Sequence, residues 1–375
     1  MEIRDTYADT SQFTHRLKAT AALLNIAENS LRSHLVDSGI DVERQSAKNP
    51  AAPAVRIFSI ENIFKIADWR RTTNKVKAFT KKPIVIAINL IKGGVGKSTT
   101  TAELAVQLQL RGYRVLVLDL DSQSNLSSLL GYEPDLEEHE AARYGLSSKA
   151  IVKYTFDHLC TPFIEFRKNR EHAWVDSKDV IKMPFGEYGP HLIPSDVYFS
   201  DLGEKLASAP GDRDHIFRNF FKASKEGKIP GFDVSHYDFI LMDCAPSVSV
   251  ISLNAMAAAD YVIAPVKMDL FGAKGISRLN TEVNGLKQRS SDVDLEVLIL
   301  PTHYSPNFSR TARMTEQLQS YRDLLTTCSI PQSEMFPSSQ GYYMPLTLQS
   351  PTSQPVNAYK EFVDVLLMNI SKRFN

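Results

Sequence analysis

Short apolar runs alternate along the chain with segments that have the spacing of amphipathic helices. The runs are almost continuously apolar, as in strands that are buried on both faces of a parallel sheet. They lie at residues 84–90, 115–118, 239–242, 261–266 and 295–300. Helical patterns cover residues 99–110, 249–258 and 272–287. This alternation predicts an α/β fold with a mostly parallel, doubly wound sheet.

The first strand of this pattern follows a junction at Lys81-Lys82-Pro83. We therefore divide the chain into a small N-terminal domain, residues 1–80, and a large domain, residues 81–375. Within the large domain, residues 132–190 lack the alternation and carry mixed charge, so we interpret them as an insertion. A length of 375 residues fits one large domain with a smaller appendage.

The N-terminal segment contains two short apolar helical patterns around a polar break between residues 19 and 40. This is the spacing of a helix-turn-helix unit, whose second helix enters the major groove of DNA. Here that helix covers about residues 28–36 and presents Asn29, Ser30, Arg32 and Ser33. The sequence thus predicts an α-helical DNA-binding domain in front of the large domain.

Composition and charge narrow the class of protein. Apolar residues make up 43% and charged residues 23%, which excludes wholesale disorder and a fibrous repeat. No apolar run reaches the roughly 18 residues that a membrane-spanning helix needs, and the start does not look like a signal peptide. Three scattered cysteines without metal-ligand spacing suit a reducing compartment, so we expect a cytoplasmic protein. The net charge is zero, so any contact with DNA depends on local basic patches.

A glycine-rich loop joins the first strand of the large domain to its first helix. Such a loop curls backbone N–H groups around phosphate, the helix N-terminus adds positive potential, and a lysine supplies a mobile cation. A hydroxyl after the lysine suits Mg²⁺, which prefers oxygen ligands. We therefore expect ATP or ADP with Mg²⁺ at Lys92, Gly93, Gly94, Val95, Gly96, Lys97, Ser98 and Thr99, with Lys97 as the cation and Ser98 as the metal ligand.

The loop departs from the strict pattern G-x-x-x-x-G-K-[ST], because Ile91 occupies the first glycine position and Lys92 follows it. The string Lys92-Gly93-Gly94-Val95-Gly96-Lys97-Ser98 resembles the deviant Walker A motif of the ParA/MinD ATPase family. The resemblance implies that Lys92 is the signature lysine, which reaches across a homodimer to the partner's nucleotide.

Two further boxes occur in the order of that family. Residues 119–123 resemble its D-x-D-P-Q box, with Ser122 in place of proline, and residues 239–246 resemble its Walker B strand. The resemblance implies that Asp121 positions the attacking water near Mg²⁺ and that Asp243 holds a metal-bound water. It also implies nucleotide contacts by Asp119 and Pro246, and adenine contacts by Thr302 and His303.

Cys244 follows Asp243 at a position where many fast P-loop ATPases carry a glutamate base. We therefore expect slow intrinsic hydrolysis. A cation delivered in trans can raise the rate of phosphoryl transfer by roughly 10³ to 10⁵. Lys92 of a partner subunit would provide that cation.

Residues 56–71 resemble the wing-then-helix segment of MerR-like winged modules, and the whole front is similar to the N-terminal winged helix-turn-helix domain of the large plasmid ParA subtype. Residues 1–18 would then be a dimerisation helix. The alternative is a small helical cap that packs on the ATPase.

Arg310 and Arg313, three residues apart, are further candidates for contact with DNA phosphates, or they belong to a solvated face.

The resemblance implies a DNA partition ATPase that acts as an ATP-dependent homodimer on non-specific DNA in the nucleoid. A ParB-like centromere-binding partner would stimulate hydrolysis, and the ADP form would bind operator DNA as an autorepressor. One alternative is a transcriptional regulator for which nucleotide is only a ligand. The other is a MinD-like membrane-positioning ATPase, but the stripe of the last helix, residues 358–370, suits core packing better than membrane contact.

Overall fold

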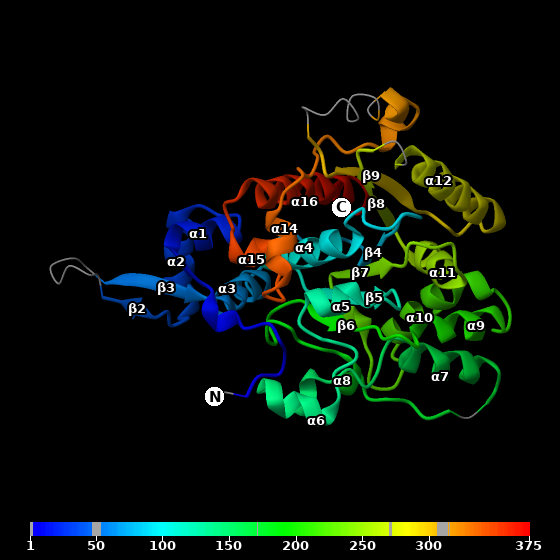
Figure 1. The fold of residues 1–375 in the computed structure, drawn as a ribbon, viewed down its shortest axis with the longest axis horizontal. Coiled ribbons are helices and arrows are strands. Elements are labelled where there is room, and N and C mark those ends of the chain that lie inside the picture. The colour runs from blue at the N-terminus through cyan, green and yellow to red at the C-terminus, as the bar shows by residue number, and fades with distance from the viewer. Residues whose placement is uncertain (1–2, 47–53, 171, 270–271, 306–313, 315) are drawn as a thin grey trace.

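A six-stranded parallel sheet forms the centre of the molecule (Figure 1). The structure is a computed structural model that describes residues 3–46, 54–170, 172–269, 272–305, 314 and 316–375. The strand order is β6-β5-β7-β4-β8-β9. The bounds are β4 Ile84–Ile88, β5 Val115–Leu120, β6 His191–Ile193, β7 Phe239–Cys244, β8 Tyr261–Lys267 and β9 Glu296–Thr302. The predicted α/β fold with a parallel sheet is confirmed.

Helices cover both faces of the sheet, because side chains of each strand point alternately to two hydrophobic cores. In β4, Ile84, Ile86 and Ile88 belong to one core, whereas Val85 and Ala87 belong to the other. The first core lies under α4 Lys97–Leu110, α5 Asn125–Leu129, α14 Met335–Gln340, α15 Leu346–Gln349 and α16 Gln354–Arg373. The second lies under α7 Asp157–Arg167, α9 Leu202–Ala207, α10 Ile216–Lys225, α11 Val250–Ala258 and α12 Gly272–Arg289.

The predicted insertion, residues 132–190, contains short helices followed by a strand that the apolar pattern did not predict. Its helices are α6 Glu138–Ala141, α7 and α8 Ser177–Val180. The strand β6 begins at His191 and pairs with β5 over three residues. It was missed because three residues are too short to show a period in the sequence. Further 3-10 helices lie at Thr10–Gln12, Ala142–Tyr144, Ser148–Ala150, Phe199–Asp201, Arg213–His215, Val234–His236 and Leu318–Leu324.

The front of the chain forms a compact unit with the predicted helix pair, which we call the N-terminal module (residues 3–46 and 54–80). Its elements are β1 Thr14–Arg16, α1 Leu17–Leu23, α2 Glu28–Ser38, β2 Arg44–Gln45, β3 Val55–Ser59 and α3 Ile60–Thr72. The strands form an antiparallel sheet in the order β1-β3-β2. Two helices around a tight turn precede the antiparallel strands β2 and β3 and a third helix, and the assignment as a winged helix-turn-helix domain stays a prediction. Residues 3–16 hold a 3-10 helix and a strand, so the helix expected across residues 1–18 is not formed there.

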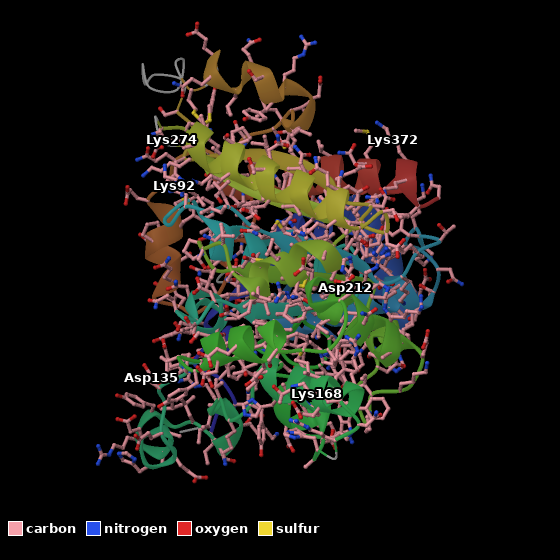
Figure 2. All side chains as sticks on the ribbon, turned by 90° about the vertical axis from the view of Figure 1, so that its right-hand side faces the viewer. Lys92, Asp135, Lys168, Asp212, Lys274 and Lys372 are labelled. Carbon is pink, nitrogen blue, oxygen red and sulfur yellow. The ribbon has the colours of Figure 1, made fainter. Side chains whose placement is uncertain are left out.

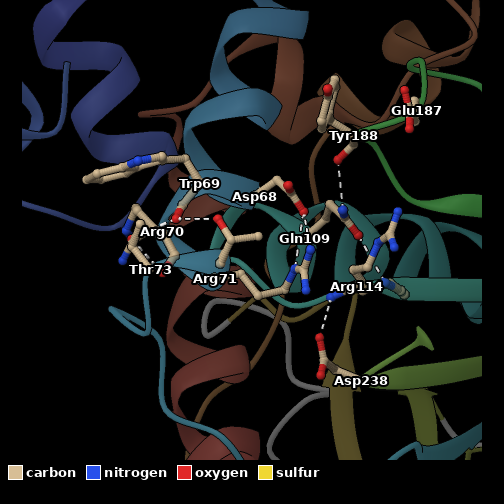
Figure 3. A network of polar contacts seen from close by, with 12 residues as sticks. Asp68, Trp69, Arg70, Arg71, Thr73, Gln109, Arg114, Glu187, Tyr188 and Asp238 are labelled. Atoms are coloured by element: carbon tan, nitrogen blue, oxygen red, sulfur yellow. Dashed lines mark hydrogen bonds and ion pairs between the residues drawn. The ribbon is translucent and has the colours of Figure 1, made fainter. Parts of the chain in front are cut away.

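The N-terminal module shares its hydrophobic core with the ATPase body. Phe58 and Phe64 are fully buried and belong to the same core as the inner face of α4. The Arg70 side chain donates from α3 to the carbonyl oxygens of Leu24 and Leu110, at 3.1 and 3.5 Å. Figure 3 shows this junction, where the end of α3 lies beside the end of α4. The module therefore packs on the large domain, as the alternative of a small helical cap predicts. Helix α2 still exposes one face.

The last helix, α16, packs Phe362, Leu366 and Ile370 into the core, as its stripe predicts. Among the described residues, none of the helices is long and apolar enough to cross a membrane.

Candidate nucleotide-binding site

The glycine-rich loop connects β4 to α4 at the carboxyl end of the sheet and lines a cavity of about 730 Å³. Gly94 and Gly96 have φ of +67° and +88°, a region in which L side chains are strained. Gly96 is also the N-cap of α4, so the loop turns directly into the helix. The predicted residues Gly93 through Thr99 all line the cavity. Backbone N–H groups at a helix N-terminus facing a cavity form an anion-binding arrangement.

Lys97, the first residue of α4, is buried at the base of this loop, with 7% of its surface exposed. Its Nζ donates to the carbonyl oxygen of Lys92 at 3.1 Å. Burial lowers the pKa of Lys97, whereas the nearby carboxylates of Asp243 and Asp121 oppose that change. The ammonium group thus lies near two acids and lines the cavity, where it can meet a phosphate.

Asp243, the last residue but one of β7, lies behind the glycine loop and is fully buried. Its Oδ1 accepts a hydrogen bond from Thr101 Oγ1 at 3.1 Å, and its carboxylate also pairs with the Ser98 hydroxyl. Burial raises the pKa of Asp243, and the Ser98 hydrogen bond and the charge of Lys97 lower it. Asp243 therefore reaches the cavity through Ser98 rather than by lining it.

Asp121 lies just beyond the end of β5 and lines the cavity together with Gln123 and Asn125. Its Oδ1 accepts the backbone N–H of Gln123 at 3.0 Å. Ser98, Asp121 and Asp243 thus bring a hydroxyl and two carboxylates together at the phosphate loop. Mg²⁺ takes oxygen ligands of this kind and normally keeps several waters, so these residues fit the ion that the sequence predicts.

Asp119, the other acid of the D-x-D box, does not line this cavity. It pairs in register with Asp243 on the neighbouring strand and is fully buried. Burial, together with the charge of Asp243, raises the pKa of Asp119. Its oxygens accept hydrogen bonds from the backbone and the side chain of Ser127 and from the backbone of Asp121.

Pro246, Thr302 and His303, the remaining predicted nucleotide contacts, all line the cavity. Thr302 Oγ1 donates to the carbonyl oxygen of Val95 at 2.9 Å, which ties the end of β9 to the glycine loop. His303 has φ of +50°. The structure thus brings both residues to the cavity beside the loop, and their contact with adenine stays a prediction.

Lys92, the signature lysine of the resemblance, is not among the cavity-lining residues. Its Nζ forms an ion pair with Asp269 Oδ1 at 2.5 Å, between the glycine loop and the segment after β8. Both side chains are about one-fifth exposed, at 21% and 23%. In Figure 2, Lys92 lies toward the same edge of the molecule as Lys274 of α12, and Lys372 of α16 lies toward the opposite edge.

One wall of the cavity was missed by the sequence prediction. It is formed by residues between β9 and α16, with one residue of α16 itself: Ile330, Pro331, Gln332, Ser333, Glu334, Phe336, Pro337, Gln340, Gly341, Tyr343 and Tyr359. The prolines indicate an irregular segment there, but no motif marks it as a ligand wall. Tyr359 of the last helix is buried, and its hydroxyl pairs with that of Thr100 at 2.9 Å.

The predicted DNA contacts lie elsewhere. Asn29, Ser30, Arg32 and Ser33 are all exposed on α2, and none of them lines the cavity. Arg32 donates to Asn29 Oδ1 at 3.0 Å. Arg310 and Arg313 lie outside the described residues.

Comparison with known proteins assigns the chain to a family. A family model described as an AAA domain matches residues 83–297, which is more than half of the chain. The chain belongs to the AAA domain family. The match begins just before β4 and contains the glycine loop, the D-x-D box and the Walker B strand.

The chain is also similar to individual proteins. The sporulation initiation inhibitor protein Soj of Bacillus subtilis is 27% identical over 291 residues, covering 76% of this chain and 98% of Soj. A putative plasmid partition protein of Borrelia burgdorferi, solved with AMPPNP, has a TM-score of 0.55 and 22% identity over 77% of this chain and 100% of that chain.

A third similar structure is cobyrinic acid a,c-diamide synthase of Mycobacterium smegmatis, solved with ADP and magnesium. It has a TM-score of 0.56 and 22% identity over 76% of this chain and 94% of that chain. These solved structures show a shared fold. The predicted P-loop fold and the predicted ParA/MinD-family ATPase are confirmed.

Proposed function

We propose that this AAA domain protein is a DNA partition ATPase that binds and hydrolyses Mg-ATP in the cavity at the glycine loop. The observation that carries this proposal is the convergence on that cavity of the loop amides, Lys97 and Asp121, with Asp243 directly behind them. A charged ligand with several phosphate oxygens fits such a set of donors and acids.

The roles of the residues follow from their positions. The amides of Gly93 to Gly96 hold the phosphates, and Lys97 neutralises the charge that develops on the transferred group. Ser98, Asp121 and Asp243 would hold Mg²⁺, and the ion would supply charge neutralisation at the phosphates. Asp121 also orients the attacking water. Because Cys244 stands where a glutamate base would be, intrinsic turnover is slow.

Stimulated turnover needs a second subunit in this proposal. Lys92 reaches the nucleotide of the partner in an ATP-bound homodimer, as its place in the motif implies. Within one subunit it is held by Asp269, which keeps its charge at the edge of the site. The homodimer then binds DNA without sequence choice and associates with the nucleoid in the cytoplasm.

The N-terminal module supplies sequence-specific binding. The exposed face of α2, with Asn29, Ser30, Arg32 and Ser33, is the face that would enter the major groove of operator DNA in the ADP state. The similarity to a putative plasmid partition protein supports DNA segregation as the wider process. A ParB-like centromere-binding protein is the proposed activator.

The experiment is ATP turnover by the full chain, alone, with non-specific duplex DNA, and with the product of an adjacent partner gene. We expect slow basal turnover and stimulation by the last two together, with none in a Lys97→Ala variant. No turnover under any condition, together with tight nucleotide binding, would favour the transcriptional regulator. Nucleotide-dependent binding to anionic liposomes would favour the membrane-positioning ATPase.

A further inference from the structure

Three donors converge on the buried carboxylate of Asp119. Its Oδ2 accepts the backbone N–H of Ser127 at 2.9 Å and the Ser127 hydroxyl at 2.7 Å. Its Oδ1 accepts the backbone N–H of Asp121 at 3.2 Å. Asp119 and Ser127 are both fully buried. The hydrogen bonds that orient this carboxylate thus come from the segment that follows it in the chain.

The Ser127 hydroxyl also accepts the backbone N–H of Ser195 at 3.0 Å. Ser195 lies two residues after the end of β6, the strand next to β5 in the sheet. A hydroxyl has one donor and accepts as well, and both capacities are used here. Ser127 therefore bridges the carboxyl ends of two neighbouring strands.

The segment between Asp119 and Ser127 carries cavity-lining residues. Asp121, Gln123 and Asn125 all face the nucleotide cavity from it. The segment turns through Ser124, which has φ of +54°, into α5, a helix of five residues. A helix this short has little stability of its own, so its position depends on contacts outside it. The hydrogen bonds between Ser127 and Asp119 join the two ends of this segment.

We propose that Asp119 and Ser127 are positioning residues that act through Asp121, by fixing the loop of residues 121–126 against the ends of β5 and β6. This inference rests on the proposed ATPase activity and gives Asp119 a role other than the direct nucleotide contact that its motif implies. Catalysis depends on such placement, because a displacement of about 1 Å in a catalytic group can cost about 100-fold in rate. Ser127, which belongs to none of the motifs, thus supports the site without lining the cavity.

The test is a double-mutant cycle in the full chain with Ser127→Ala, Asp119→Asn and the double variant. We expect each single change to lower kcat for ATP about tenfold or more, with the Kd for a fluorescent ATP analogue changing less than about threefold. Because both residues act through one contact, the double variant should be no slower than the slower single variant.

The matched control is Ser224→Ala. Ser224 is an equally buried serine that bridges Phe232 and Val234 in the second core, away from the cavity, with hydrogen bonds of 2.9 and 3.1 Å. It should lower stability and leave kcat unchanged. A Ser127→Ala protein with normal kcat, additive effects in the cycle, or an equal loss of kcat in Ser224→Ala would each overturn the positioning role.

Hydrogen exchange separates this inference from the proposed function. Ser127→Ala should speed exchange of backbone amides in residues 121–129 and leave those of α4 unchanged, whether or not the protein hydrolyses ATP. Unchanged exchange in residues 121–129 would overturn the inference by itself. Absent turnover in the unmodified chain, with the expected change in exchange, would overturn only the ATPase proposal.

Discussion

At the scale of single residues, the two lysines of the glycine loop occupy different environments. Lys97 is buried among the carboxylates of the site, whereas Lys92 is partly exposed and paired with Asp269. An exposed or partly exposed ion pair of this kind contributes little stability and can exchange partners at small cost. The difference predicts different consequences when each lysine is replaced.

Lys97→Ala should remove measurable nucleotide binding, because the ammonium group and its position at the start of α4 are both needed at the phosphates. We expect the Kd for a fluorescent ATP analogue to rise by roughly 100-fold or more, since a charge-assisted contact in a buried site is lost. Equilibrium titration measures this change, and an unaltered melting temperature confirms that the variant is folded. Tight binding by a folded variant would contradict the phosphate role.

Lys92→Gln should leave nucleotide binding within a few-fold of normal and abolish the stimulated part of turnover. The lysine adds charge only when a second subunit is present, and such a cation can contribute roughly 10³-fold or more. Steady-state ATPase assays with DNA and the partner protein measure the effect. Lys274→Gln on α12 is the matched control. Normal stimulation in Lys92→Gln would argue against a lysine acting in trans.

Residue types in the three motifs could be assigned from the sequence, because phosphate and metal chemistry restricts which side chains can serve. The structure brings Gly93 to Thr99, Asp121, Pro246, Thr302 and His303 to one cavity. The hydrogen bonds of Asp119 could not be predicted, because they depend on where Ser127 and Ser195 fall in three dimensions. No local pattern marks Ser127 as different from Ser128.

At the scale of elements, α4 connects the nucleotide site to α15 through a buried acid. Glu103 Oε1 accepts the backbone N–H of Leu346 at 2.7 Å, and its Oε2 accepts the hydroxyl of Thr347 at 2.5 Å. In the same helix, the carbonyl oxygen of Leu348 lies 2.8 Å from His15 Nε2. The same short helix is therefore held by the phosphate-loop helix and by β1 of the N-terminal module.

Glu103 predicts a pH dependence of stability. Burial raises the pKa of Glu103 from 4.5 to about 7. The hydrogen bonds that its carboxylate accepts from Leu346 and Thr347 only partly oppose this rise. The folded state therefore binds more protons than the unfolded state between these values. Its contribution to stability falls as pH rises through this window, by on the order of 3 kcal/mol.

Glu103→Gln removes this titration. The free energy of unfolding of the variant, minus that of the unmodified chain, should rise between pH 4.5 and pH 7.5 and then level off. Denaturant midpoints for both proteins at pH 5 and pH 8 measure the difference. A constant difference across this range would show that Glu103 is not the titrating group.

The exposed face of α2 predicts a separable loss of DNA binding. Arg32→Ala should weaken binding to an operator fragment by roughly tenfold or more, the range for a side chain that reads base edges, and leave basal ATPase activity unchanged. Fluorescence anisotropy in fixed salt measures the affinity. Arg170→Ala, which removes an exposed arginine after α7, is the control. Equal operator affinity in both variants would remove α2 from the DNA interface.

Most elements could be predicted, because long apolar runs and helical stripes are local signals. β6 and the cavity wall between β9 and α16 could not, since three-residue strands and irregular segments have no period. The two additional residues at the start of α4 depend on Gly96, whose left-handed conformation lets the helix begin at Lys97. The helical pattern of the sequence alone predicts that this helix begins two residues later, at residue 99.

At the scale of the whole molecule, the N-terminal module and the body form one hydrophobic core on the α4 side of the sheet. That core runs from Leu31 and Phe64 of the module to Phe362 of α16. The rings of Phe64 and Phe185 stack at 6.2 Å across the junction. The apolar pattern of the sequence changes near residue 80, but residues on both sides of this junction are buried in the same hydrophobic core. We therefore expect the two parts to unfold together.

The two tryptophans provide a test, because Trp69 lies in α3 and Trp174 lies in the body. Proteins with Trp69→Phe or Trp174→Phe each retain one probe. Their denaturant transitions should coincide, and Phe64→Ala should lower both midpoints, with a loss of roughly 3–5 kcal/mol for a buried ring. Separate transitions, or a loss seen by Trp69 alone, would show two independent units.

The shared core also limits how this protein can be re-engineered. A designer who transplants the front module to another P-loop scaffold would leave Leu31 and Phe64 without the apolar neighbours that bury them here. Arg70 would lose its acceptor at the end of α4 as well. A working chimaera must therefore carry the α4 residues of this core as part of the graft, so the practical cut lies inside the large domain and not at the linker.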